Sequence, residues 1–162
     1  GKLLKELKTA AKKDLPQLAR ELLARWPDER IKLHTIARAL EFRREHPQLL
    51  SGDYIPLACH GPRELQQTAF ARTDHREWLI CVTPRRCWPA WQESQDEAPQ
   101  SSWPLAEWWR GTELVMPAAA PRRWRHILSG AELETQTGDA GPTLALRTLL
   151  SSFPVAILQG IS

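Results

Sequence analysis

The spacing of the apolar residues changes near Gly52, and this change limits what the chain can fold into. Before it, apolar residues recur at steps of three and four, and after it they alternate. The first period is that of a helix with one buried face, and the second is that of a half-buried strand. The 162 residues suffice for one ordinary domain with a helical appendage. We therefore predict an α+β fold, with a helical segment over 1–50 and a C-terminal antiparallel β-sandwich domain over 51–162.

The helical segment has recognisable start and stop signals. Asp14 is placed to cap one helix, and Gln17 three residues later completes a capping-box pattern. Asp28 is placed to cap the next helix, which ends before Pro47 because proline disfavours helical geometry in the preceding residue. The predicted helices cover residues 1–13, 15–26 and 29–46.

The second part of the chain reads as short strands bounded by Gly, Pro or Asp. Trp78 and Trp124 fall inside strand patterns, so we expect them in the core. A helical turn is expected within 144–150, and a long, irregular, Trp-rich loop over 84–110. The predicted strands cover residues 54–59, 67–72, 77–83, 112–116, 124–128, 132–134 and 153–158, and seven short strands suggest a sandwich.

Composition excludes several classes of protein. The run at 153–158 is far below the roughly 18 apolar residues of a membrane span, and lysines interrupt the leucines of the first helix, so no signal peptide is expected. Three cysteines without CxxC spacing disfavour a disulfide framework and a zinc site. The basic residues of the first part alternate with acidic ones, which favours a solvated helix face over nucleic-acid binding. We expect a cytoplasmic chain without membrane or nucleic-acid partners.

Sequence motifs of catalytic sites are lacking. The chain has no glycine-rich phosphate loop, no HExxH and no GxSxG. Acidic pairs such as Asp28 with Glu29 and Asp96 with Glu97 are adjacent, so their side chains diverge and make poor acid/base partners. The five histidines are dispersed over the chain. We therefore name no catalytic residue, no metal ligand and no cofactor.

An ordered set of short motifs runs through nearly the whole chain. It begins with the stretches 14–16, 26–28 and 30–33, continues with 39–50 followed by Gly52, Asp53 and Tyr54, and ends with 52–57, 69–72, 109–112, 124–130 and 153–158. This set resembles the alpha-amylase family of glycoside hydrolases, and within it the maltooligosyl trehalose synthases, with 39–54 similar to the join between the last barrel helix and the C-terminal β-domain. Arg110, in the turn 109–112, departs from the pattern of the family, in which an acidic residue is common in this turn.

The resemblance implies an isomerase of maltooligosaccharides in trehalose biosynthesis. In that family the terminal α-1,4 bond is rearranged to an α,α-1,1 bond by the mechanism of retaining glycosidases, with an Asp nucleophile, a Glu acid/base and a third Asp. All three would lie on barrel strands upstream of this chain, which would be a non-catalytic C-terminal fragment. Helix 15–26 would then expose an apolar patch for self-association, because its barrel partners are missing.

Two sets of residues are candidates for substrate binding. If 29–46 is the last barrel helix, its N-terminus faces the active site, and Asp28, Arg30 and Lys32 lie near the substrate entrance. Capping and solvation are the ordinary roles of such residues. The loop tryptophans Trp88, Trp91 and Trp103 could form a sugar platform or pack back onto the sheet. The alternative function is therefore a stand-alone, non-enzymatic carbohydrate-binding or interaction module.

Overall fold

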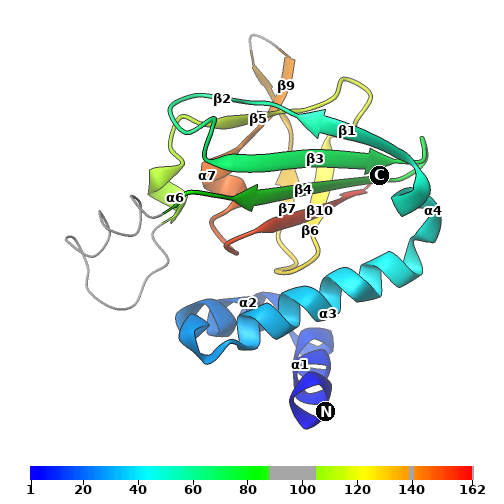
Figure 1. Ribbon diagram of the computed structural model, residues 1–162, viewed down its shortest axis with the longest axis vertical. Helices are drawn as coiled ribbons and strands as arrows, with labels where there is room; N and C mark the ends of the chain where they lie inside the picture. Colours follow the sequence, from blue (N-terminus) through cyan, green and yellow to red (C-terminus); the bar gives the residue numbers. More distant parts are fainter. Residues whose placement is uncertain (88–104, 139–140, 162) are drawn as a thin grey trace.

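Helices form the first third of the chain in a computed structural model that describes residues 1–87, 105–138 and 141–161 (Figure 1). All three predicted helices are confirmed, and a further short helix follows Pro47. Gly52 ends the helical part and β1 begins at the next residue, as the change of period predicts. The elements are α1 (Lys2–Lys13), α2 (Leu15–Ala24), the 3-10 turn η1 (Trp26–Asp28), α3 (Arg30–Glu45) and α4 (Pro47–Ser51).

The cap at Asp14 is confirmed, but the capping box is not. The Asp14 carboxylate accepts a hydrogen bond from the Gln17 N–H at 2.9 Å. The Gln17 side chain donates to Glu21 instead of reaching back to the Asp14 backbone. The reason is that the Asp14 N–H already donates to the carbonyl of Ala10 at the end of α1. One aspartate therefore serves as the junction of two helices.

The strands after Gly52 pair only in antiparallel fashion among the described residues. One sheet has the order β1-β3-β4-β10-β6-β7, and the other has the order β2-β5-β9-β8. The bounds are β1 (Asp53–Leu57), β2 (Cys59–His60), β3 (Gln67–Thr73), β4 (Trp78–Pro84), β5 (Glu113–Val115), β6 (Arg123–His126), β7 (Glu132–Glu134), β8 (Gln136–Gly138), β9 (Gly141–Ala145) and β10 (Ala156–Ile161). The α+β class is thereby established.

Several element boundaries differ from the sequence prediction. β8 and β9 were not predicted. For β9 the reason is that Gly141 and Pro142 are typical of turns and rare inside strands. The last strand begins at Ala156, after the bend that holds Pro154. Part of the predicted loop 84–110 is the short helix α6 (Leu105–Trp108), and 88–104 lie outside the described residues. The predicted helical turn is present as α7 (Leu146–Leu149).

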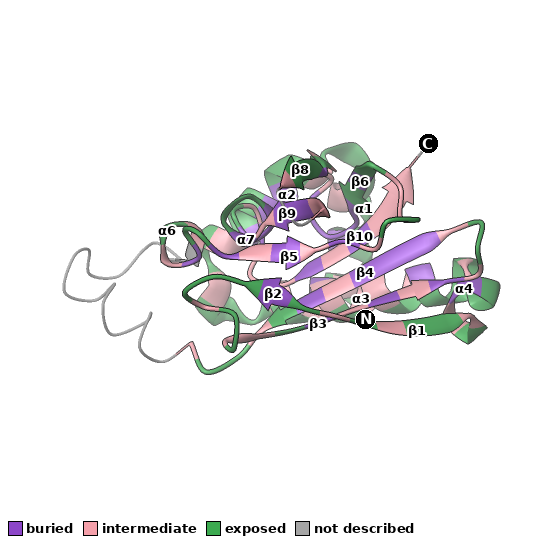
Figure 2. Cartoon of the chain, turned by 90° about the horizontal axis from the view of Figure 1, so that it is seen from above, coloured by how far each residue is buried: buried purple, intermediate pink, exposed green. Residues whose placement is uncertain are grey.

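Both faces of the six-stranded sheet carry a hydrophobic core (Figures 1 and 2). Along β4, Ile80 and Val82 face the core shared with the second sheet, whereas Leu79 and Cys81 face the core shared with the helices. This alternation follows from the strand period of two. The order of layers is therefore helices, six-stranded sheet, four-stranded sheet. No helix among the described residues is long and apolar enough to cross a bilayer.

The two strand tryptophans lie in the core between the sheets, as predicted. Trp124 is fully buried, and its indole N–H donates to the Thr135 hydroxyl at 3.1 Å. Trp78 is 9% exposed. Both belong to the same cluster of buried residues. An indole combines a large buried area with one polar group that needs a partner, which explains the Thr135 contact.

The predicted exposed patch on α2 is wrong. Leu18 and Leu22 of this helix are buried against Leu7 of α1, so α1 takes the place of an outside partner. The exposed large apolar side chains of the described residues lie outside α2, and two of them are on α3, where Ile36 is 49% exposed and Leu40 is 57% exposed. Periodicity identified the apolar face of α2 correctly but could not show that α1 covers it.

Candidate functional site on helix α3

Two of the residues predicted to contact substrate lie where η1 passes into α3: Asp28 ends η1 and Arg30 begins α3. Arg30 and Asp28 form an ion pair, with Nε 2.7 Å from Oδ2, and the Arg30 N–H donates to Asp28 Oδ1 at 3.1 Å. Burial would raise the pKa of Asp28, but the hydrogen bonds and the charge of Arg30 outweigh it and lower the pKa. Asp28 thus holds the first amide of α3, although Glu29, in a left-handed conformation, occupies the N-cap position.

Lys32, the third candidate of this set, is not brought to the pair. It is exposed on α3, and it is two positions from Arg30, a spacing at which helical side chains do not face each other. Trp88, Trp91 and Trp103 lie outside the described residues. Among the candidates that the structure describes, Asp28 and Arg30 are therefore the two that it brings together.

An apolar groove of about 500 Å³ lies between α3 and the six-stranded sheet. Leu40 of α3 and Tyr54 of β1 both line the groove. Tyr54 stacks on Phe70 with ring centroids 5.1 Å apart, and the Arg72 guanidinium lies 5.2 Å from the Tyr54 ring. Arg72 also donates to the carbonyls of Leu50 and Gly52, which fixes the junction between α4 and β1.

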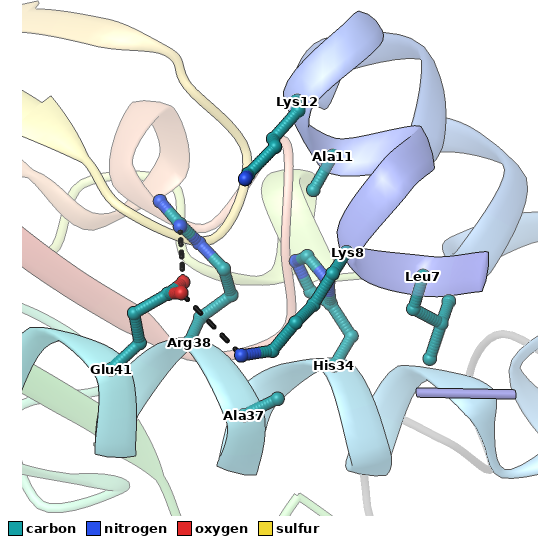
Figure 3. Close-up of a pocket in the computed structure, with 8 residues that line it drawn as sticks. All are labelled: Leu7, Lys8, Ala11, Lys12, His34, Ala37, Arg38 and Glu41. Atoms are coloured by element: carbon teal, nitrogen blue, oxygen red, sulfur yellow. Dashed lines mark hydrogen bonds and ion pairs between the residues drawn. The ribbon is translucent and has the colours of Figure 1, made fainter. Parts of the chain in front are cut away.

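A second hollow, of about 210 Å³ and with charged residues in its lining, lies between α1 and α3 (Figure 3). Two small side chains leave this space open, Ala11 on α1 and Ala37 on α3. The other lining residues are Leu7, Lys8 and Lys12 on α1, and His34, Arg38 and Glu41 on α3. On each helix they are spaced at about one turn, so each helix presents a single face to the hollow.

Glu41 balances part of the positive charge in the hollow. Its carboxylate lies 3.5 Å from the Lys8 ammonium and 3.0 Å from Arg38 Nη1. Burial would raise the pKa of Glu41, but these two cations outweigh it and lower the pKa. Lys12 forms no ion pair within the described part of the chain.

His34 forms the buried side of the hollow. It is 2% exposed, and its Nε2 lies 2.9 Å from the Leu128 carbonyl, so Nε2 carries the proton and donates. Burial lowers the pKa of His34, as does the charge of Arg38, although the Leu128 carbonyl opposes the shift. The ring is therefore neutral near pH 7, and its Nδ1 remains a hydrogen-bond acceptor.

Two partly buried carboxylates among the described residues contact basic side chains. A retaining glycosidase holds two carboxyl groups about 5 Å apart, whereas Glu41 pairs with Arg38 and Glu77 contacts the His46 ring here. No group of three or more potential metal ligands occurs among the described residues.

The hollow was not identified from the sequence, although part of its signal was present. Lys8 and Lys12 are four residues apart, as are His34 and Arg38, so each pair lies on one helix face. In a single sequence such pairs look like an ordinary solvated face. Only the crossing of α1 over α3 brings the two pairs together.

Comparisons with known proteins support the fold. No protein-family model and no curated protein matches the chain. Among solved structures, a point mutant of maltooligosyltrehalose synthase from Arthrobacter ramosus superposes on 86% of this chain with a TM-score of 0.56 and 22% sequence identity. The match spans 16% of that enzyme's chain. At this level of identity, the likeness establishes that the chain shares its fold with a part of that enzyme.

Proposed function

We propose that this chain is the C-terminal part of a maltooligosyl trehalose synthase of the alpha-amylase family. Such an enzyme rearranges the terminal α-1,4 bond of a maltooligosaccharide to an α,α-1,1 bond. The observation that carries the proposal is the shared fold over 86% of the chain, because the motifs that resemble the family run through nearly the same length in order. The role of this part is structural.

The exposed face of α3 supports this proposal. A last barrel helix packs its apolar face on the barrel strands. Ile36 and Leu40 are one turn apart on α3 and are both about half exposed, so they form an apolar strip. In the proposed enzyme an upstream (β/α)8 barrel covers this strip, and the six-stranded sheet supports the opposite side of the helix through Phe42.

The start of α3 would then lie at the catalytic face of the barrel. The Asp28 and Arg30 pair fixes the first turn of the helix. In the proposed enzyme this turn and Lys32 line the substrate entrance, where the cations hydrogen-bond sugar hydroxyls. The three catalytic carboxylates come from the barrel, and Trp88, Trp91 and Trp103 are candidates for a further glycan contact.

Incubation with maltopentaose tests the catalytic part of this proposal. The chain alone should release neither reducing sugar nor trehalosyl ends above a blank. Product formation would place a catalytic carboxyl pair inside the 162 residues and would overturn the proposal.

A titration with the same sugar separates the proposal from the alternative. Tryptophan fluorescence should change little on addition of maltopentaose, because a detached supporting domain has lost its barrel. Saturable binding by the chain alone would instead identify a stand-alone carbohydrate-binding module. An open reading frame with no (β/α)8 barrel upstream of these residues would also overturn the proposal.

A further inference from the structure

The hollow between α1 and α3 has an excess of positive charge among the described residues that line it. Lys8, Lys12 and Arg38 supply three cations, and Glu41 is the one acidic residue that lines the space. Glu41 is already engaged by Lys8 and Arg38. Lys12 extends from α1 toward this space (Figure 3). A ligand that enters the hollow therefore meets a net positive charge, including the Lys12 ammonium group, which pairs with no described acidic residue.

The shape and the remaining polar group restrict the ligand further. A volume of about 210 Å³ is below the range of about 300 Å³ or more that is typical of sites for larger ligands, so the hollow suits a small anion. His34 offers an acceptor atom at the buried side, because its Nε2 is used by the Leu128 carbonyl. A protonated phosphate oxygen or a hydroxyl beside the phosphate can donate to that atom.

We propose that this hollow is a binding site for a small phosphate-bearing ligand, either inorganic phosphate or a phosphate monoester. Lys12 and Lys8 contact the phosphate oxygens from α1, and Arg38 contacts them from α3. The Arg38 Nε donates to the Ile127 carbonyl at 3.1 Å, so its guanidinium is held in place before the ligand arrives. Glu41 keeps Lys8 and Arg38 oriented and limits the affinity for anions. The proposal does not depend on the function proposed above.

Calorimetric titration at low ionic strength provides the test, with inorganic phosphate as the probe. The wild-type chain should bind one phosphate with a dissociation constant on the order of 1 mM or tighter. Lys12→Gln should weaken binding about tenfold, because it removes one charge-assisted contact without breaking an internal ion pair. Lys13→Gln is the matched control, because Lys13 is an exposed neighbour of Lys12 that does not line the hollow. This variant should bind phosphate with the same affinity as the wild type.

A variant that should bind phosphate more tightly than the wild type complements Lys12→Gln. Glu41→Gln removes the acidic residue that lines the hollow, so phosphate should bind several-fold more tightly. Circular dichroism checks that this variant retains its helices. If the helices are lost, the comparison of the phosphate affinities of Lys12→Gln and Lys13→Gln tests the proposal without it. Glycerol 3-phosphate in place of phosphate distinguishes the two sources, because tighter binding of the ester identifies a monoester site and weaker binding identifies a site for inorganic phosphate.

Three outcomes would overturn the proposal. The first is no saturable binding of phosphate or glycerol 3-phosphate up to about 10 mM. The second is equal affinity of Lys12→Gln and the wild type. The third is equal weakening by Lys12→Gln and Lys13→Gln, which would show a diffuse effect of surface charge.

Discussion

Directed hydrogen bonds hold several of the buried polar side chains in this protein. His34 donates to the Leu128 carbonyl, and His126 accepts from the Leu128 N–H through Nδ1 at 3.2 Å. Trp124 donates to Thr135. Burial disfavours the charged form of an imidazole, so both histidines are neutral in the folded state. The stability of the fold must therefore depend on pH.

The first prediction concerns His126. Burial lowers its pKa from 6.5 to about 4, against the opposing effect of the Val155 carbonyl. Between pH 6.5 and about pH 4, the His126 ring is protonated in the unfolded chain but neutral in the folded protein. The free energy of unfolding that this group contributes is therefore fully present above pH 6.5 and falls as the pH drops toward 4. Urea unfolding should show a loss of about 2 kcal/mol in the free energy of unfolding between pH 7 and pH 5 from this group.

Two variants check the assignment to His126. His126→Asn keeps an acceptor for the Leu128 N–H but has no titrating ring, so the slope of stability against pH should become smaller. Part of the slope should remain, because burial lowers the pKa of His34 in the same direction. His60→Gln is the control, since His60 is exposed. An unchanged slope in His126→Asn would contradict the prediction.

The junction between α4 and β1 shows how one element positions the next. Gly52 lies between the two elements, its N–H donates to the Leu49 carbonyl, and its carbonyl accepts from Arg72. A Cβ atom at this position would overlap the backbone carbonyl of Thr73 on β3. The absence of a side chain therefore allows the helical segment to turn directly onto the edge of the sheet.

We predict that Gly52→Ala destabilises the protein through this contact. The neighbouring atoms belong to the backbone and cannot rotate away, so the cost should be about 3 kcal/mol or more. Gly138→Ala is the matched control, because its Cβ would meet its nearest neighbour at 3.5 Å, an ordinary contact. Urea midpoints of the two variants make the comparison. Equal midpoints would mean that β1 shifts away from β3 at little cost.

The whole molecule has three layers, and the helical layer is only partly covered. Its inner side packs on the six-stranded sheet through Phe42 and Leu49. Its outer side carries Ile36 and Leu40 on α3, next to the groove that Tyr54 also lines. An exposed apolar strip of this kind is typical of an interaction surface. The stability of the isolated chain should not depend on it.

A pair of leucine variants tests this distinction. Leu40→Gln should change the free energy of unfolding by no more than about 0.5 kcal/mol, because the side chain is largely exposed. It should also reduce the binding of a hydrophobic fluorescent dye. Leu22→Ala, at a fully buried position, should cost about 2–5 kcal/mol. A large loss of stability in Leu40→Gln would show that the strip is packed in the isolated chain.

Local chemistry accounts for most of the features that the sequence analysis predicted correctly. The apolar stripes of α1 and α2, the Asp14 cap and the change of period at Gly52 each depend on residues within a few positions of one another. On α3 the stripe does not mark the buried face, because Ile36 and Leu40 are about half exposed while His34 and Phe42 are buried. Trp78 and Trp124 were assigned to the core on strand pattern alone. β9 was missed because its Gly141 and Pro142 have poor strand propensity, which pairing with β5 and β8 overrides.

The sequence by itself determined which faces of the elements are apolar, because side-chain direction follows directly from the helical and strand periods. Tertiary structure alone decided what covers those faces. α1 buries the stripe of α2, the stripe end of α3 at Leu40 stays open, and β10 from the end of the chain inserts between β4 and β6. The hollow at Lys12 and His34 depends on the same kind of information. Contacts between segments far apart in the chain depend on how the whole molecule packs. The period of one helix or strand does not specify which other element covers its apolar face.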